Sequence, residues 1–543
     1  MRPESAVLWC LLACQGGGGG ADAEALKVVG LAIEPEEAEL VTGPAGGETQ
    51  QFLATVTYED GTVEDVDFVE WSSSNRTAGS VDETGLFTPS SENGGVTWVT
   101  AALGGKEAQA TVDVLYTDTI DDEGLAGQFE SESGVPLDAW TYPEDGVALP
   151  RNTPSIRFQW DEGVLADAWR VRFRSEFTDI TAYTSAHEFE ADGDLWASIA
   201  ATNAGGTVEV ELARAVAGLI DVSDPLEIQV NRMDQTGSIF YWSTSDEGFM
   251  EIPYGGEVEP WLTSDDVGEC IGCHAASPHD TMAFTYGEST DGWLGVKEIE
   301  TRDDVLGYNE EYFGNLKAWR PDGDLLVTAF YGQLMMYDAE TIEYLGEIAG
   351  PEGGGLTHPD WSPDGKQLVV TKTSNLGDWY FQAGQLAVMD YLGDGQFGDP
   401  VVLYAPDPGC VSGCLKAYYP AWSPDGEWIA FNVASGTMWE DETAEVWVIA
   451  AEGGDPIRLD AANLGEDLGN SWPRWGPLPD DDILWLTFAS NRTYGNSRDD
   501  EPKIWVSAFD AEEAELGLDP SFPAFFLPSQ DEESNNHLPV WVE

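Results

Sequence analysis

The sequence predicts an all-β protein with two N-terminal β-sandwich domains followed by an approximately six-bladed β-propeller. Three observations lead to this prediction. At 543 residues the chain is too long for one hydrophobic core. Short strand-type runs separated by Gly, Asp and Asn occur along nearly the whole chain. A Trp-x-Pro-Asp-Gly motif repeats in the C-terminal half, as expected for successive propeller blades.

The charge balance is extreme, with 100 acidic residues against 23 basic ones and a formal net charge of -77. We expect no nucleic-acid partner, because phosphate contacts need clusters of Lys and Arg that this chain lacks. The even spread of carboxylates favours a solvated surface suited to salty surroundings. Binding of Ca²⁺ or of a basic partner is the alternative. The acidic turn Asp480-Asp481-Asp482 is a possible Ca²⁺ ligand set, although it lacks the regular spacing of a dedicated calcium loop.

The N-terminus has the pattern of an export signal, which we assign to residues 1–13. Arg2 precedes the short apolar stretch Ala6–Ala13, and Leu11-Leu12-Ala13-Cys14 resembles the lipobox of bacterial lipoproteins. That resemblance implies lipidation of Cys14, a Gly-rich tether over residues 14–27, and anchoring in outer-membrane lipid on the periplasmic or cell-surface side. An ordinary secretory signal with a chance cysteine is the alternative. Later in the chain no run of 18 apolar residues predicts a transmembrane helix.

Two strand-rich segments follow the tether. In residues 28–116, the segments Trp71–Asn75 and Val81–Phe87 resemble a group-2 bacterial Ig-like domain, which implies a spacer or adhesive module. Residues 117–133 form an acidic linker. In residues 134–254, the segment Trp160–Phe173 is similar to a fibronectin type III-like domain. Residues 197–217 are small and alternating, which predicts strand and loop.

Residues 255–543 contain the repeat that predicts the propeller. The copies begin at Trp319, Trp361 and Trp422, and a degenerate copy begins at Trp475. Each copy is followed by a short apolar strand, and Pro-Asp-Gly supplies the tight turn between them. These repeats resemble the TolB-type, WD-like propeller family. Residues 536–541 read as one more blade-opening strand, so we expect the C-terminus to close the ring.

Cys270-Ile271-Gly272-Cys273-His274 is a C-x-x-C-H motif. In this spacing two thiols can reach the two vinyl groups of one porphyrin, and the following imidazole can bind the iron. The motif therefore predicts one covalently attached haem c with His274 as the proximal ligand. A reducible disulfide or half of a zinc site is the alternative. The motif lies in register with a blade-opening strand, which resembles propellers that carry an embedded haem motif.

The positions of two further histidines relative to the repeat suggest candidates for the distal haem ligand. His358 and His537 each lie at a blade entrance, so we expect either to face the same end of the propeller as His274. A hydrogen-bonding role is the alternative for each. Tyr418 and Tyr419 are candidates for lining the pocket. Two other residues close to the motif are less suited, since His279 falls in a turn and Met282 falls in strand register, where a core position is expected.

Cys410 and Cys414 flank a short loop, and a disulfide is the simple interpretation, with metal binding as the alternative. The chain contains no G-x-S-x-G elbow, P-loop or H-E-x-x-H motif.

The sequence leaves two candidate functions. The first is a lipid-anchored, monohaem c-type cytochrome-like propeller for electron transfer or haem-based redox chemistry, with an unknown redox or surface partner. The alternative is a cell-surface protein- or glycan-binding scaffold in which haem is structural or absent. Enzymatic activity is left open.

Overall fold

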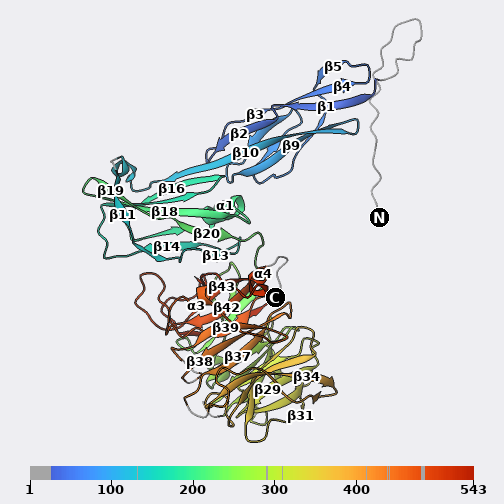
Figure 1. Ribbon diagram of the computed structural model, residues 1–543, viewed down its shortest axis with the longest axis vertical. Coiled ribbons are helices and arrows are strands. Elements are labelled where there is room, and N and C mark those ends of the chain that lie inside the picture. The colour runs from blue at the N-terminus through green and yellow to red at the C-terminus, as the bar shows by residue number, and fades with distance from the viewer. Residues whose placement is uncertain are drawn as a thin grey trace.

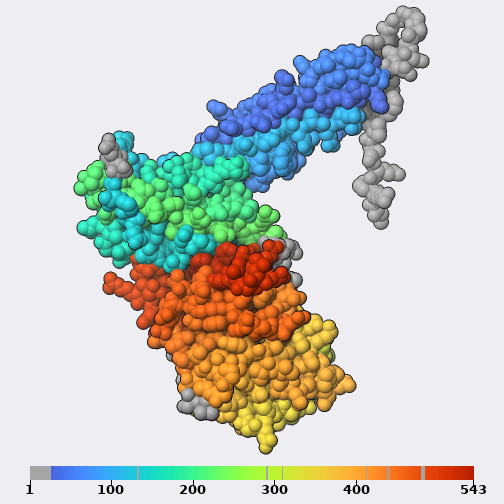
Figure 2. Space-filling model, viewed as in Figure 1, coloured from blue at the N-terminus to red at the C-terminus, as the bar shows by residue number. Residues whose placement is uncertain are grey.

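The computed structural model describes residues 26–130, 133–288, 291–308, 310–410, 413–436, 438, 441–477 and 483–543. Cys14 and the Asp480–Asp482 turn lie outside these residues. The all-β prediction is confirmed, with 51% strand and 5% helix. Figures 1 and 2 show three bodies in sequence order, a blue first domain, a teal-to-green second domain and a yellow-to-red propeller.

The first domain is a sandwich of short sheets. One sheet has the order β1-β4-β5, a second has the order β3-β8-β7, and β10 pairs with both β2 and β9. Its core includes Phe52, Phe87, Val99 and Val112, all fully buried. The strands are β1 (Val28–Glu34), β2 (Glu37–Thr42), β3 (Gln50–Gln51), β4 (Leu53–Tyr58), β5 (Val63–Val66), β6 (Glu70–Ser73), β7 (Gly79–Val81), β8 (Leu86–Pro89), β9 (Gly95–Leu103) and β10 (Lys106–Ile120).

One continuous strand joins the first two domains, so the predicted linker start at residue 117 is wrong. The end of β10, Tyr116–Ile120, pairs in parallel with β16 of the second domain. The acidic segment reads as a linker from its composition, but its first residues alternate as Thr-Asp-Thr-Ile and Tyr116 is buried. A strand can carry solvent-facing Asp at every second position. The two domains therefore share a sheet.

The second domain is a sandwich of a small sheet, β12-β14-β17, and a larger one that contains β15, β16, β18 and β19. Aromatic pairs join the two sheets, with 5.2 Å between the ring centroids of Phe158 and Phe173. The elements are η1 (Ala126–Phe129), β11 (Ser133–Leu137), β12 (Trp140–Tyr142), β13 (Ala148–Leu149), β14 (Ile156–Trp160), β15 (Ala168–Arg174), β16 (Thr178–Thr184), β17 (Glu188–Ala191), α1 (Gly193–Thr202), β18 (Thr207–Val216), β19 (Leu219–Ser223) and β20 (Leu226–Val230).

Helix α1 corrects the expectation of strand and loop for residues 197–202, whereas the rest of that segment is the expected loop and strand, with β18 over Thr207–Val216. Asp192 caps the N-terminus of α1, because the side chain accepts a hydrogen bond from the Leu195 N–H at 3.0 Å. Trp196, Ile199 and Ala200 then share one buried face at helical spacing. The small residues that suggested a strand are therefore the packed side of a helix.

The propeller has six blades of antiparallel strands, which confirms the predicted architecture. We number them blade 1 (β24–β27), blade 2 (β28–β31), blade 3 (β32–β36), blade 4 (β37–β40), blade 5 (β41–β44) and blade 6 (β45 with β21–β23). Blades 1 to 3 contain β24 (Ile271–Ala276), β25 (Thr281–Tyr286), β26 (Trp293–Glu298), β27 (Asp304–Leu306), β28 (Leu316–Trp319), β29 (Leu325–Phe330), β30 (Gln333–Asp338), β31 (Tyr344–Ile348), β32 (Gly355–Trp361), β33 (Gln367–Thr373), β34 (Gly384–Gly393), β35 (Gln396–Phe397) and β36 (Val401–Tyr404).

Blades 4 to 6 complete the ring. Their elements are β37 (Lys416–Trp422), β38 (Trp428–Ala434), β39 (Glu445–Ala450), β40 (Ile457–Arg458), α3 (Asp460–Asn463), β41 (Ser471–Trp475), β42 (Ile483–Ser490), β43 (Lys503–Asp510), α4 (Ala511–Glu515), β44 (Phe525–Phe526), β45 (Asn536–Val542), β21 (Ser238–Ser243), β22 (Gly248–Pro253), β23 (Glu259–Thr263) and α2 (Ser264–Val267). The C-terminal strand β45 pairs with β21, so the predicted closure is confirmed.

This closure corrects the predicted domain boundary at residues 254 and 255. Strands β21 and β22 belong to blade 6 of the propeller, not to the second sandwich. The Trp-x-Pro-Asp-Gly repeat marks the innermost strand of a blade, and blade 6 takes that strand from the other end of the chain. The propeller therefore begins near Ser238 without its recognition motif.

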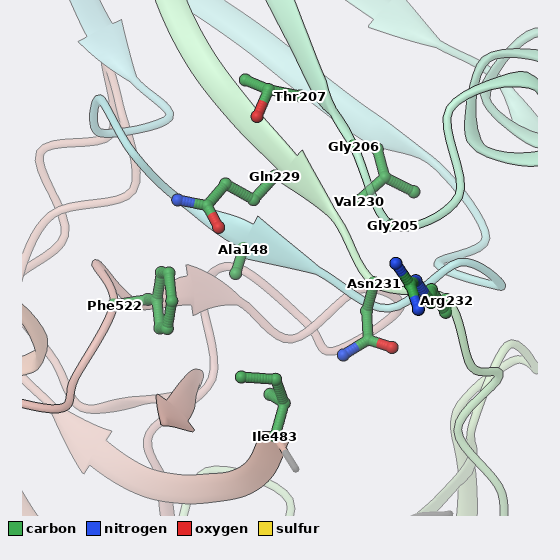
Figure 3. A pocket seen from close by; sticks show the side chains of 10 residues that line it. All are labelled: Ala148, Gly205, Gly206, Thr207, Gln229, Val230, Asn231, Arg232, Ile483 and Phe522. Atoms are coloured by element: carbon green, nitrogen blue, oxygen red, sulfur yellow. The ribbon is translucent and has the colours of Figure 1, made fainter. Parts of the chain in front are cut away.

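The second domain is docked on blades 5 and 6. The Tyr142 hydroxyl accepts a hydrogen bond from the Phe526 N–H at 3.2 Å, and the Asn496 side chain donates to the Trp160 carbonyl at 2.9 Å. A pocket of about 290 Å³ lies between the two bodies. Figure 3 shows Asn231 and Arg232 of the second domain facing Ile483 and Phe522 of the propeller across it.

Candidate functional site at the C-x-x-C-H motif

The motif, residues 270–274, lies at the start of β24, the innermost strand of blade 1. The pairing of β24 with β25 shifts between Gly272 and His274, so Cys273 is an extra, bulged residue with φ of 43°. A positive φ is unusual for a non-glycine residue. Blades 3 to 6 have the same bulge, with positive φ at His358, Tyr419, Trp472 and Leu538.

This register places the three histidines at different positions of their blade entrances. In blades 3 to 6 the bulged residue is followed by proline, at Pro359, Pro420, Pro473 and Pro539. His274 occupies the proline position of blade 1, and Cys273 occupies the bulge. His358 is therefore equivalent to Cys273, and His537 is equivalent to Gly272. Neither of the two proposed distal ligands is in the register position of His274.

Both cysteines of the motif line one pocket at the start of β24. The pocket has a volume of about 310 Å³, and its other walls include Trp242, Tyr286 and Trp379. Neither Cys270, which is exposed, nor Cys273, which is half-buried, takes part in a disulfide. Burial raises the pKa of the Cys273 thiol to about 11, so that thiol is neutral at pH 7. The structure thus brings both cysteines of the motif to one cavity that has aromatic side chains in its wall.

His274 is buried on the other side of β24. Its ring lies 4.6 Å, centroid to centroid, from Phe249 of blade 6, and it does not line the pocket with the thiols. Neither ring nitrogen has a hydrogen-bond partner, and the backbone of Phe240 faces the ring outside hydrogen-bonding geometry. Burial lowers the pKa of His274 to about 3, so the imidazole is neutral at pH 7. Leaving such a buried group without a partner costs about 1–3 kcal/mol.

Lys317 of β28 holds the bulge in place, a role that sequence reasoning missed. Its buried ammonium donates hydrogen bonds to the carbonyls of Cys273 and Asn315 and to the Thr285 hydroxyl. Burial lowers the pKa of Lys317 to about 7. The sequence does contain a signal for this role. When the blades are aligned on the tryptophan of the repeat, Lys317 lies two residues before Trp319, at the position where four other blades have proline.

His358 is a hydrogen-bonding residue in the structure. Its Nδ1 lies 3.1 Å from the Thr371 hydroxyl and its Nε2 lies 3.0 Å from the Asp378 carbonyl. The ring also packs on Tyr419, at 4.3 Å between centroids. Burial lowers the pKa of His358 well below its usual value. Both nitrogens are engaged, so binding a metal would require His358 to give up one of these contacts.

His537 lies on β45, beside the pocket but not in its wall. It pairs across the strands with Trp242, which does line the pocket, at 6.3 Å between ring centroids. The side chain is buried, and burial lowers its pKa from 6.5 to about 4, with a smaller contribution from the Lys503 ammonium. The indole of Trp242 is therefore the nearer group to the thiols.

The lowered pKa of His537 predicts a pH-dependent stability. In the unfolded chain the ring takes a proton near pH 6.5, whereas in the folded protein it does so only near pH 4. The free energy of unfolding therefore falls as the pH drops through this window, by about 1.4 kcal/mol per pH unit. Urea unfolding at about pH 7 and about pH 5 should show a smaller difference for His537→Gln than for the wild type. Equal pH dependence in the two proteins would contradict the assignment.

The other residues predicted near the site lie elsewhere. Tyr419 stacks on Trp472 at 3.6 Å between centroids, and its hydroxyl donates to the Met438 carbonyl. Like Tyr418, it is fully buried and does not line the pocket. His279 is exposed in the turn at the opposite end of β24, and Met282 is a core residue, as expected.

The second cysteine pair is joined. Cys410 and Cys414 form a disulfide, with 5.8 Å between their Cα atoms. Within the described ranges, no group of three or more His, Cys, Asp or Glu side chains is arranged to hold a metal ion. The described residues also include no helix that is both long and apolar enough to span a bilayer.

Comparisons with known proteins give similarity of fold only. No family model matches the chain, and no curated protein matches it. Among solved structures, TolB from Acinetobacter baumannii is 16% identical, with a TM-score of 0.38, over 63% of this chain and 80% of that one. A putative TolB from Agrobacterium tumefaciens is 16% identical, with a TM-score of 0.33, over 54% of this chain and 89% of that one. The dihydro-heme d1 dehydrogenase NirN is 15% identical, with a TM-score of 0.31, over 54% of each chain.

Proposed function

We propose that this chain is an extracytoplasmic, lipid-anchored β-propeller that carries one covalent haem c and transfers single electrons. Cys270 and Cys273 would hold the porphyrin through thioether bonds, and His274 would be the proximal iron ligand. The observation that carries the proposal is the C-x-x-C-H motif at the start of the innermost strand of blade 1. Its two thiols share one pocket, and its imidazole is buried without a hydrogen-bond partner.

The residues present fit this group. A ligating imidazole must be neutral, and burial keeps His274 in that form. One of its two partnerless nitrogens would gain a partner in the iron, and the aromatic residues in the pocket wall suit an apolar macrocycle. Bound haem would supply one-electron chemistry through its iron. Because His274 and the thiols lie on different sides of β24, we expect residues 270–274 to rearrange when the group is attached.

The remaining parts of the chain suit a tethered carrier. Lipidation at Cys14 would place the protein on the outer membrane, facing the periplasm or the cell surface. The first two domains, which we propose to be Ig-like and fibronectin type III-like, follow one another beyond the same end of the propeller, with the first domain set at an angle to the second (Figure 2). They would act as spacers that hold the propeller away from the lipid. The docked contacts between the second domain and blade 5 would fix the propeller relative to its spacer.

The experiment is the visible spectrum of the ectodomain expressed with haem-attachment machinery. We expect a Soret band that survives acid–acetone extraction. In His274→Phe the haem should stay attached through the thiols, but its ligand-field spectrum should change, because the proximal nitrogen is lost.

The matched control is His187→Phe in the second domain, which should leave the spectrum unchanged. Substitution of His537 or His358 would then identify the sixth ligand by a change of spin state. A colourless wild-type protein would overturn the proposal and leave an anchored recognition scaffold as the function.

A further inference from the structure

The mouth of the thiol pocket is bordered by a patch of exposed apolar side chains. Tyr331 is 52% exposed, Leu376 is 61% exposed and Tyr380 is 70% exposed. Tyr380 itself lines the pocket. Large apolar side chains gathered at a functional opening, rather than scattered singly, indicate an interaction surface. We call these three residues the mouth patch.

The mouth patch is held rigidly against the pocket. The buried Asp378 accepts hydrogen bonds from the N–H groups of Tyr331 and Gly332 and from the side chain of Asn315, a pocket residue. Gly332 also packs closely on Leu376, since a Cβ on Gly332 would lie 3.2 Å from its Cα. One buried carboxylate therefore ties the loop of blade 2, the loop of blade 3 and the pocket wall together. A preorganised surface of this kind loses little entropy on binding.

The loops around the mouth patch carry only one sign of charge. Residues 244–247, 264–270, 287–288, 291–292, 307–308, 310–315, 331–332 and 374–383 all lie at this end of blades 6, 1, 2 and 3, and they contain no Lys or Arg. Their exposed acidic residues are Asp246, Glu247, Asp265, Asp266, Glu269, Glu288, Glu310 and Glu311. The nearest buried cation, Lys317, has all three of its donors engaged below the pocket.

We propose that a small, lysine-rich redox protein docks on the mouth patch and exchanges electrons with the group held by Cys270 and Cys273. This inference rests on the proposed function. The apolar centre would let the partner's own apolar cofactor edge approach the pocket without an intervening hydrated charge. The surrounding carboxylates would attract the partner's lysines and orient it during encounter. An acidic partner is disfavoured, because like charges would meet at four of these loops.

The test is the rate of electron transfer from the reduced holoprotein to a lysine-rich cytochrome c. We expect the second-order rate constant to fall steeply with ionic strength. The double variant Glu269→Lys/Glu288→Lys should slow the reaction by about tenfold at low salt. The matched control, Glu300→Lys/Glu340→Lys, reverses two exposed charges at the opposite end of the propeller and should have no effect. Leu376→Ser, which removes an apolar contact without changing the charge, should likewise slow transfer, and its control Leu392→Ser, at a similarly exposed leucine on the far end of β34, should not.

The small anion ferricyanide separates docking from chemistry. It should oxidise the Glu269→Lys/Glu288→Lys variant no more slowly than the wild type, because its own charge is negative. If the protein contains haem but the mouth and far-end variants react alike with cytochrome c, the docking proposal is wrong and the proposed function stands. If the wild-type protein contains no covalent haem, the proposed function itself fails.

Discussion

Replacing Cys270 and Cys273 together by serine is expected to abolish covalent haem attachment. Serine has nearly the shape of cysteine, but its oxygen does not form the thioether bond that fixes the porphyrin. Each single substitution should leave one bond and a haem that is still carried through denaturation. The measurement is the intact mass of the denatured protein together with its absorbance after acid–acetone extraction.

The chain offers its own control. Cys410→Ser/Cys414→Ser removes the same number of sulfurs from the joined pair, neither of which lines the pocket, and should retain the full haem content. Loss of haem in this control, or its retention in Cys270→Ser/Cys273→Ser, would show that the thiols lining the pocket are not the attachment point. A fall in soluble yield of both double variants would be separated from attachment by comparing haem per folded protein.

Trp541→Ala is expected to destabilise the propeller by about 3–5 kcal/mol, because it empties a large buried site at the ring closure. The indole stacks on Tyr254 at 5.5 Å between centroids, and its N–H donates to the Thr236 carbonyl at 2.9 Å. It also packs on Gly476 of blade 5, where a Cβ would lie 2.9 Å from the ring. One side chain thus joins both ends of the propeller and the neighbouring blade.

Urea unfolding, followed by tryptophan fluorescence, measures this effect. The control is Trp98→Ala on β9, where the side chain is 49% exposed, and its cost should stay within about 0.5 kcal/mol. Deletion of residues 536–543 should be more severe, since β21 would lose its partner strand. Equal stability of Trp541→Ala and Trp98→Ala would contradict the role of β45 in holding the ring closed.

The propeller could be predicted because each repeat encodes a local structure with a physical cause. In Trp361-Ser362-Pro363-Asp364-Gly365, the glycine has a φ of 65° and its N–H donates to the Ser362 carbonyl at 2.8 Å. The Ser362 hydroxyl accepts from the Gln367 N–H at 3.0 Å and so ends the turn. These contacts depend on residues within six positions of one another, and a sequence pattern can report them.

The errors came from features that depend on distant parts of the chain. Blade 6 lacks the repeat at its start because its innermost strand is β45, so the predicted boundary fell after β22. Strand β10 continues past Tyr116 because β16 offers a parallel partner, which acidic composition does not reveal.

The candidate site likewise combines a local feature, which the sequence reveals, with contacts to distant parts of the chain, which it does not. The C-x-x-C-H spacing is local and could be recognised, whereas its surroundings are not. The bulge at Cys273 separates the register of His274 from that of His358, and a one-residue shift in pairing does not appear in composition. Lys317 reaches Cys273 from the next blade, 44 positions further along the chain. Only the three-dimensional arrangement identifies it as a support for the motif.

The central claim is that a porphyrin is bonded to the sulfurs of Cys270 and Cys273, and intact-mass spectrometry of the unfolded wild-type ectodomain tests it most directly. The account predicts one species heavier than the polypeptide by a single haem, with the added mass on the peptide that contains residues 270–274. A mass equal to that of the bare polypeptide, after expression with the attachment machinery, would contradict it.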